Sequence, residues 1–241
     1  MLREFLSRLE KEGRLIRISK QVSVKYEIAS VMRNLQDKTI LFENVKGFDI
    51  PVVANLCSTR EMVASGLCVQ KERIIESLVH AMKKPNEPRI HGHEYKELPC
   101  DLRKLPVLTY YKEDGGPYIA SAIFFARDAE YGINASYHRM MVLGKDRFVA
   151  RILPRNFHTY LERGLREFAI CIGNPVQVLI SSAMSPGLGV SELSIANSLK
   201  EIRVVDVDGH IVPEAEIVMI CLLYTSPSPR DLSTSRMPSS A

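Results

Sequence analysis

Hydrophobic and polar positions alternate between two periods along the first 84 residues. Apolar side chains recur at helical spacing in three segments, 2–9, 28–35 and 74–82. Short apolar runs predict strands at 15–18, 22–24, 39–42 and 50–54. Gly13 is a stop signal for the first helix, and Thr59 is a candidate N-cap of another short helix. This alternation predicts a small α/β unit.

Prolines at 85, 88, 99 and 106 punctuate the next stretch, which is typical of a linker. The linker contains His91-Gly-His-Glu94, in which two histidines and a carboxylate lie close together in sequence. A metal site needs more fixed ligands than this short cluster supplies, so a surface loop is the favoured interpretation.

Beyond the linker the pattern becomes rich in strands. Asp114-Gly-Gly116 predicts a turn, and the apolar runs 118–126 and 133–142 predict a hairpin. Further strands are expected at 147–153, 167–172, 202–207 and 211–212. Helices are expected around 156–163, after Asn174 as cap with Pro175 in the first position, and over 192–199 with Ser191 as cap.

The second strand of the predicted hairpin carries unusual polar residues. Side chains alternate along a strand, so Asn134, Ser136 and His138 share one face, and Tyr137 and Arg139 share the other. A single site that uses both Asn134 and Arg139 therefore requires a bulge or a strand end between them. The alternative is an edge strand with a solvated polar face.

Composition and charge exclude several classes of protein. With 46% hydrophobic and 25% charged residues the chain is an ordinary globular sequence, and its net charge of +4 is dispersed, which argues against nucleic-acid binding. Five widely spaced cysteines without a CxxC motif indicate reduced, mostly buried thiols. No segment resembles a signal peptide or a membrane span, so a cytoplasmic location is expected.

Several motifs occur in an order that resembles the UbiD family of decarboxylases, over roughly residues 1–219. They are Asp-Gly-Gly-x-Tyr at 114–118, Asn134 followed by Arg139, Leu-Pro-Arg at 153–155, the apolar strand with Gly-Asn-Pro at 169–175, Gly-Val-Ser-Glu at 189–192 and the later strand at 212–218. The resemblance implies an α+β fold. It places a small N-terminal α/β domain with its linker at 1–99 and a split β-barrel, similar to flavin reductases, at 100–219.

The resemblance also implies an activity. Members of this family use prenylated FMN, a divalent metal (usually Mn²⁺, or Mg²⁺) and often K⁺ to remove CO₂ from α,β-unsaturated or aromatic acids, or to run the reverse reaction. A flavin prenyltransferase supplies the cofactor, and a homo-oligomeric parent protein is expected. Residues 220–241 depart from the family pattern and end in a Ser/Pro-rich tail. We therefore expect an artefactual or disordered tail, and a fragment that lacks the catalytic acid and is itself inactive.

Individual residues match the family motifs. Asn134 and Glu192 match two metal ligands, whereas the third position, a histidine in the family, corresponds to His158 or, without an insertion, to Asn156. Arg139 matches the catalytic arginine, whose guanidinium can grip a carboxylate. The resemblance implies further flavin contacts at Asn134, Tyr137, His138, Arg139, Arg151, Ile152, Leu153, Ser182 and Met184, the last two in the loop that also serves potassium.

Two other functions remain open on the sequence. The first is a split-barrel module that binds flavin or metal without catalysis, and the second is a structural protein with these polar groups on its surface. The substrate also stays open: a phosphorylated unsaturated acid of archaeal isoprenoid synthesis and a 4-hydroxybenzoate-type quinone precursor are both compatible with the motifs.

Overall fold

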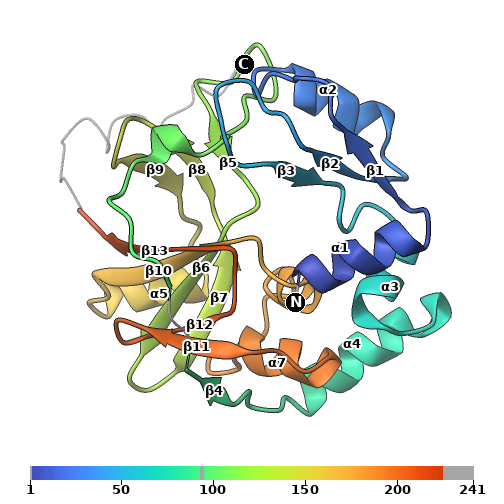
Figure 1. Cartoon of the computed structure of the whole chain (residues 1–241). Coiled ribbons are helices and arrows are strands. Elements are labelled where there is room, and N and C mark those ends of the chain that lie inside the picture. Colours follow the sequence, from blue (N-terminus) through green and yellow to red (C-terminus); the bar gives the residue numbers. More distant parts are fainter. Residues whose placement is uncertain (1, 93–94, 225–241) are drawn as a thin grey trace, which may run out of the picture.

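The computed structural model describes residues 2–92 and 95–224. The described residues form a mixed α/β architecture of helices and four small sheets (Figure 1). Their buried side chains form separate hydrophobic clusters. The helices are α1 Leu2–Lys11, α2 Glu27–Asn34, α3 Arg60–Leu67, α4 Ile74–Lys83, α5 Asn156–Glu162, α6 Val176–Ser181 and α7 Glu192–Leu199, with 3-10 turns η1 Lys71–Arg73 and η2 Leu102–Lys104. None of these helices is long and apolar enough to cross a membrane.

The strands are short. They are β1 Leu15–Ile18, β2 Thr39–Phe42, β3 Val52–Ala54, β4 Ile90–His91, β5 Tyr118–Ile119, β6 Ile123–Asp128, β7 Gly132–Tyr137, β8 Arg139–Val142, β9 Phe148–Arg151, β10 Glu167–Ile172, β11 Val204–Val207, β12 His210–Pro213 and β13 Ile217–Leu222. They form sheets of order β1-β2-β3, β13-β10-β6-β7, β12-β11-β4 and β5-β8-β9.

The N-terminal elements follow the sequence pattern closely. β1 pairs with β2 in parallel and β2 with β3 antiparallel, and the apolar face of α2 packs on this sheet through Ile28 against Ile40 and Phe42. Thr59 caps α3, since its side chain accepts a hydrogen bond from the Met62 backbone N–H. The predicted helices of this unit and its strands at 15–18, 39–42 and 50–54 are confirmed, whereas 22–24 forms no strand and Val22 makes only an isolated bridge to Val45.

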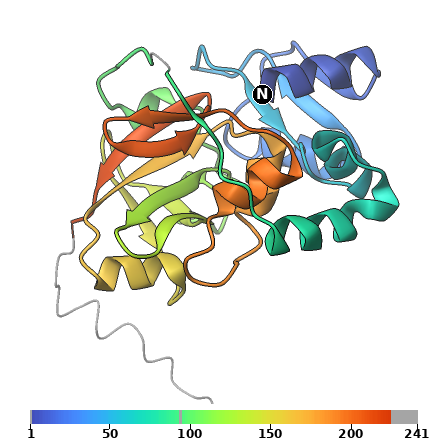
Figure 2. The ribbon, with the colours of Figure 1, turned by 90° about the horizontal axis from the view of Figure 1, so that it is seen from below.

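The four-stranded sheet is buried on both faces, which explains the continuous apolar run of β6. Ile123 and Phe125 face one core, with α7, β11 and β12, whereas Phe124 and Ala126 face the other, with α5, β8 and β9. Figure 2 shows the two-stranded ribbon β11–β12 over this sheet and α7 beside α4. Because successive side chains of a strand point to opposite faces, this one sheet contributes residues to both cores.

The predicted single hairpin is wrong in detail. The segment 118–142 forms four strands that belong to two sheets, because β5 pairs with β8 whereas β6 pairs with β7. The chain passes from one sheet to the other at His138, which lies between β7 and β8. Periodicity along one strand carries no information about which partner strand it joins.

Three smaller predictions are also corrected. Pro175, not Asn174, occupies the N-cap of α6, and Asn174 instead donates a hydrogen bond from Nδ2 to the Cys171 carbonyl. Ser191 is the N-cap of α7 but its side chain makes no capping bond. The linker contains β4, which pairs with β11, so part of it is a strand. His91 lies on this strand, and the rest of its predicted loop includes residues 93–94, which lie outside the described part of the chain.

Two close approaches hold the elements together. A Cβ atom added at Gly66 of α3 would lie 2.4 Å from Val176 Cγ1 of α6. Gly173 has φ +78°, and a Cβ there would lie 2.5 Å from Glu216 Cγ. These glycines allow contacts that a larger residue would block. The five cysteines are free; Cys171 is buried, Cys57 and Cys221 are half-buried, and Cys68 and Cys100 are exposed, so the expectation of mostly buried thiols is wrong.

Candidate functional site

Asn134 lies in the middle of β7, and its side chain points into the protein. The strand pairs with β6 so that Asn134 lies opposite Ala126, and only 3% of the asparagine is exposed. A buried amide needs hydrogen-bond partners, because an unpaired polar group inside the protein is costly. The contacts of this side chain therefore define the local chemistry.

The partner of Asn134 is Glu192, which is the first residue of α7 and is 1% exposed. Asn134 Nδ2 donates to Glu192 Oε1 at 3.0 Å, and the Ala135 backbone N–H donates to Oε2 at 2.8 Å. Burial raises the pKa of Glu192 to about 7, although these hydrogen bonds favour the ionised form. A carboxyl group with a pKa near neutrality, in contact with a buried amide, is typical of a functional site.

Ser136 and His138 continue the polar face of β7. Ser136 Oγ lies 3.2 Å from Asn134 Oδ1 and 3.0 Å from His138 Nε2. The imidazole ring packs against Phe124 and Phe157, with ring centroids 4.7 and 4.8 Å away. Burial lowers the pKa of His138, and a hydrogen bond with the Arg151 backbone partly opposes this effect.

The strand break at His138 separates Asn134 from Arg139, as a shared site requires. Arg139 begins β8, where it lies directly opposite Arg151 of β9, and both residues are exposed. Within the described part of the chain neither guanidinium has an acidic partner at ion-pair distance. Two like charges on facing strand positions repel each other, so this position favours an anion.

The third predicted metal position is on α5. His158 Nδ1 lies 3.5 Å from Glu162 Oε2 on the same helix, and 39% of the histidine side chain is exposed. Asn156 Nδ2 instead donates to the Pro186 carbonyl at 3.0 Å, in the loop that precedes α7. Among the described residues, no three His, Cys, Asp or Glu side chains are grouped to hold a metal ion. The choice between His158 and Asn156 stays a prediction.

The other predicted flavin contacts come from two regions. Arg151 ends β9, and Ile152 and Leu153 follow it, with Leu153 exposed. Ser182 is the C-cap of α6; its Oγ is buried and has no hydrogen-bond partner among the described residues. Met184 follows in the loop towards α7 and is half-buried. Tyr137 faces away from Asn134, and its hydroxyl donates to the Leu179 carbonyl at 3.0 Å.

Sequence reasoning missed Tyr160. Its hydroxyl donates to the Tyr131 carbonyl at 3.2 Å, and burial, together with the nearby charge of Glu192, raises its pKa to about 12. Tyr160 lies four residues after Asn156, so helical spacing places both on one face of α5. This spacing was the feature of the sequence from which Tyr160 could have been identified.

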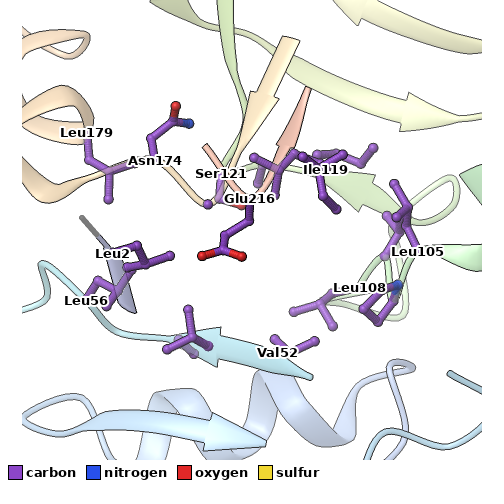
Figure 3. Close-up of a pocket in the computed structure, with 18 of the residues that line it drawn as sticks. Leu2, Val52, Leu56, Leu105, Leu108, Ile119, Ser121, Asn174, Leu179 and Glu216 are labelled. Atoms are coloured by element: carbon purple, nitrogen blue, oxygen red, sulfur yellow. The ribbon is translucent and has the colours of Figure 1, made fainter. Parts of the chain in front are cut away.

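A cavity of about 490 Å³ opens between the N-terminal sheet and the strands of the larger unit. Its wall is mostly apolar, and Tyr137 and Ser121 contribute to it. Figure 3 shows the Glu216 carboxylate pointing into this cavity, between Leu2 and Ile119. Arg3 of α1 binds both Glu216 oxygens, with Nε 2.9 Å from Oε1 and Nη2 2.6 Å from Oε2. The sequence does not reveal this pair, because 213 residues separate its members.

Two family models match the chain. Residues 6–82 match the N-terminal domain of 3-octaprenyl-4-hydroxybenzoate carboxy-lyase (UbiD_N), and residues 82–227 match the Rift-related domain of the same carboxy-lyase (UbiD). Among curated relatives, anhydromevalonate phosphate decarboxylase of Methanothermobacter thermautotrophicus is 36% identical over 231 residues, which cover 90% of this chain and 54% of that protein. The chain spans about half the length of the curated relatives it matches.

Solved structures show the same fold. The UbiD-class enzyme HmfF of Pelotomaculum thermopropionicum, in an evolved dimeric form in complex with prFMN, matches with a TM-score of 0.86 and 37% identity, covering 91% of this chain and 56% of that one. Vanillic acid decarboxylase of Sedimentibacter hydroxybenzoicus in closed form matches with a TM-score of 0.84 and 25% identity, covering 91% of this chain and 54% of that one.

Proposed function

Because the chain belongs to the UbiD family of carboxy-lyases, we propose that it serves the non-oxidative decarboxylation, or the reverse carboxylation, of an α,β-unsaturated or aromatic acid. The cofactors would be prenylated FMN and a divalent metal. The observation that carries this proposal is the buried pair of Asn134 and Glu192, which joins two segments 58 residues apart.

The donor atoms of this pair fit a hard divalent cation. Carboxylate and amide oxygens are preferred by Mg²⁺ and Mn²⁺, which commonly complete their coordination with water and phosphate oxygens. Asn134 and Glu192 would hold the metal, with His158 or Asn156 as a third ligand. A cation would also compensate the burial of the Glu192 charge, whose cost is visible in its raised pKa. The buried Ser182 hydroxyl, which lacks a partner in the part of the chain that the structure describes, fits the proposed loop for flavin and potassium.

The proposed flavin site lies where the chain changes sheets. Tyr137, His138 and Arg139 would contact the cofactor from β7 and β8, and further contacts would come from Arg151, Ile152, Leu153, Ser182 and Met184. The junction of the sheets β13-β10-β6-β7 and β5-β8-β9 at His138 supports a split β-barrel, similar to flavin reductases, over residues 100–219, after an N-terminal domain with linker over 1–99. When bound, the prenylated flavin supplies the electron sink for cleavage of the bond to CO₂.

Arg139 would orient the substrate carboxylate. A guanidinium forms two parallel hydrogen bonds with a carboxylate, and no acidic side chain of the described residues competes for Arg139. The facing Arg151 adds positive charge next to it. We assign no general acid among these residues.

The apolar cavity would accept the body of the acid. Its volume of about 490 Å³ falls within the usual range of small-molecule sites, about 300–1,000 Å³. Tyr137 is common to this cavity and to the predicted flavin contacts. A flavin prenyltransferase would supply the cofactor, and the homologous dimer of HmfF supports a homo-oligomer.

The test is to co-express the chain with a flavin prenyltransferase and record the visible spectrum and the metal content. Asn134→Ala and Glu192→Ala should each lose bound metal and weaken flavin binding. Glu201→Ala is the matched control, since this exposed glutamate lies just beyond the other end of α7. CO₂ release from unsaturated acids is then measured. Flavin binding without CO₂ release would support the non-catalytic module, and absence of both cofactors would refute the proposal.

A further inference from the structure

The polar face of β7 poses a hydrogen-bonding problem at Ser136. Its hydroxyl lies within reach of two acceptors, Asn134 Oδ1 at 3.2 Å and His138 Nε2 at 3.0 Å. A serine hydroxyl carries one hydrogen, so it can donate to only one of them at a time. The protonation of the histidine ring decides which acceptor receives it.

The second contact of the ring determines its neutral tautomer. The His138 ring hydrogen-bonds to the backbone of Arg151, and this bond favours the protonated ring, so the backbone group is the carbonyl acceptor. Because Nε2 faces Ser136, Nδ1 is the nitrogen that donates to this carbonyl. In the neutral ring Nε2 therefore lacks a hydrogen and accepts the one from Ser136.

The surroundings favour the neutral ring. Phe124 of β6 and Phe157 of α5 pack against it, and burial lowers its pKa. At neutral pH the Ser136 hydrogen is thus directed to His138 and away from Asn134.

The Asn134 amide group is held in one orientation. Its Nδ2 group donates to Glu192, which keeps Oδ1 on the side of Ser136. With the Ser136 hydrogen on His138, both lone pairs of Asn134 Oδ1 are free of that hydroxyl, and the amide lies beside the buried Glu192 carboxylate. Oxygen atoms arranged in this way bind a cation.

We propose that His138 is a positioning residue that acts through Ser136: the neutral ring takes the hydroxyl hydrogen and leaves the Asn134 amide oxygen available to a divalent cation beside Glu192. The inference rests on the proposed metal site, to which it adds the residues that keep one ligand free. Without the acceptor on the ring, the hydroxyl would turn to Asn134 Oδ1 and occupy one of its two lone pairs, which would make this oxygen a weaker ligand for a cation.

The test is a titration of the whole chain with Mn²⁺ in the absence of flavin. Binding is measured from the decrease in the electron paramagnetic resonance signal of free Mn²⁺. His138→Leu should weaken binding about threefold to tenfold, the range expected for one added neutral hydrogen bond. Ser136→Ala should bind like the unmodified chain. The double variant Ser136→Ala/His138→Leu should regain the affinity, because no hydroxyl remains to cap Asn134. His138→Gln, which keeps an acceptor, should stay close to the unmodified protein.

Recovery of Mn²⁺ affinity in the double variant distinguishes a positioning role of His138 from a role in packing. If the double variant binds as weakly as His138→Leu, the histidine acts only through the structure, and the proposal is overturned. Equal Mn²⁺ affinity of His138→Leu and the unmodified chain overturns it as well. Circular dichroism of each variant checks that it is folded, and His138→Gln provides the comparison if the leucine variant is not.

A second measurement does not require the metal. The ¹⁵N chemical shifts of the His138 ring in the metal-free chain at pH 8 should show hydrogen on Nδ1 and an accepting Nε2, whose resonance moves in Ser136→Ala. The opposite tautomer would overturn the inference even if Mn²⁺ binds. If the shifts agree but the unmodified chain binds no Mn²⁺, the proposed metal site has failed, and with it the role of His138 towards a cation.

Discussion

The buried Glu192 carboxyl should make the stability of the protein depend on pH in an unusual direction. Burial raises its pKa from 4.5 to about 7 in the folded chain. Between these values the folded protein keeps a proton that the unfolded chain has released. The free energy of unfolding therefore decreases as the pH rises through this window, whereas most paired carboxylates stabilise as the pH rises.

The size of this change in the free energy of unfolding follows from the shift of the Glu192 pKa. Each pH unit between the two pKa values corresponds to about 1.4 kcal/mol, so Glu192 alone should lower the free energy of unfolding by about 3 kcal/mol between pH 4.5 and pH 7.5. The substitution Glu192→Gln removes the titrating group and keeps the shape of the side chain. Its stability should lack this contribution.

The assay is urea unfolding of both proteins in the presence of a chelator, at half-unit steps from pH 4.5 to pH 7.5. Other groups titrate in both proteins, so the difference between the two curves isolates Glu192. The difference should change steadily across the window and become constant above about pH 8. Parallel curves would show that the folded and unfolded carboxyl groups titrate alike, and would refute the reasoning.

Two further predictions concern the helices, one their packing and one their N-terminal caps. Gly66→Ala should reduce stability by about 1–3 kcal/mol in thermal unfolding, because the new Cβ would lie 2.4 Å from Val176, whereas Gly144→Ala has no atom within 4 Å and should change little. Thr59→Ala should cost about 1 kcal/mol through the lost cap of α3, and Ser191→Ala, which removes a cap residue without a side-chain bond, should cost less. Equal losses within either pair would contradict these contacts.

Apart from the strand expected at 22–24, the helices and strands of the first 84 residues could be predicted from the sequence because their signals are local. The spacing of Phe5 and Leu9 defines the buried face of α1, and the cap at Thr59 is a contact within four residues. The polar face of Asn134, Ser136 and His138 was also readable, since alternation along a strand is a local property. The motif order over residues 1–219 was sufficient to indicate the family, which the family models confirm.

The cap of α6 shows where local reasoning fails. Asn174 has the composition of an N-cap, yet its amide donates to the Cys171 carbonyl, and the helix begins one residue later. Gly173 has φ +78°, and a Cβ there would lie 2.5 Å from Cγ of Glu216, which comes from a distant segment. The Asn174 side chain thus bonds back to the end of β10 and not forward to the first turn of α6.

The sequence by itself determined the periods of the elements, the candidate ligands and the family, because these depend on neighbouring residues and on motif order. Only the tertiary structure decided that Asn134 meets Glu192 across 58 residues, that the chain changes sheets at His138, and that Arg3 meets Glu216 at the cavity. Burial is the physical reason for the difference. The high pKa of Glu192 arises from the exclusion of water around a carboxyl group that only the packed chain buries.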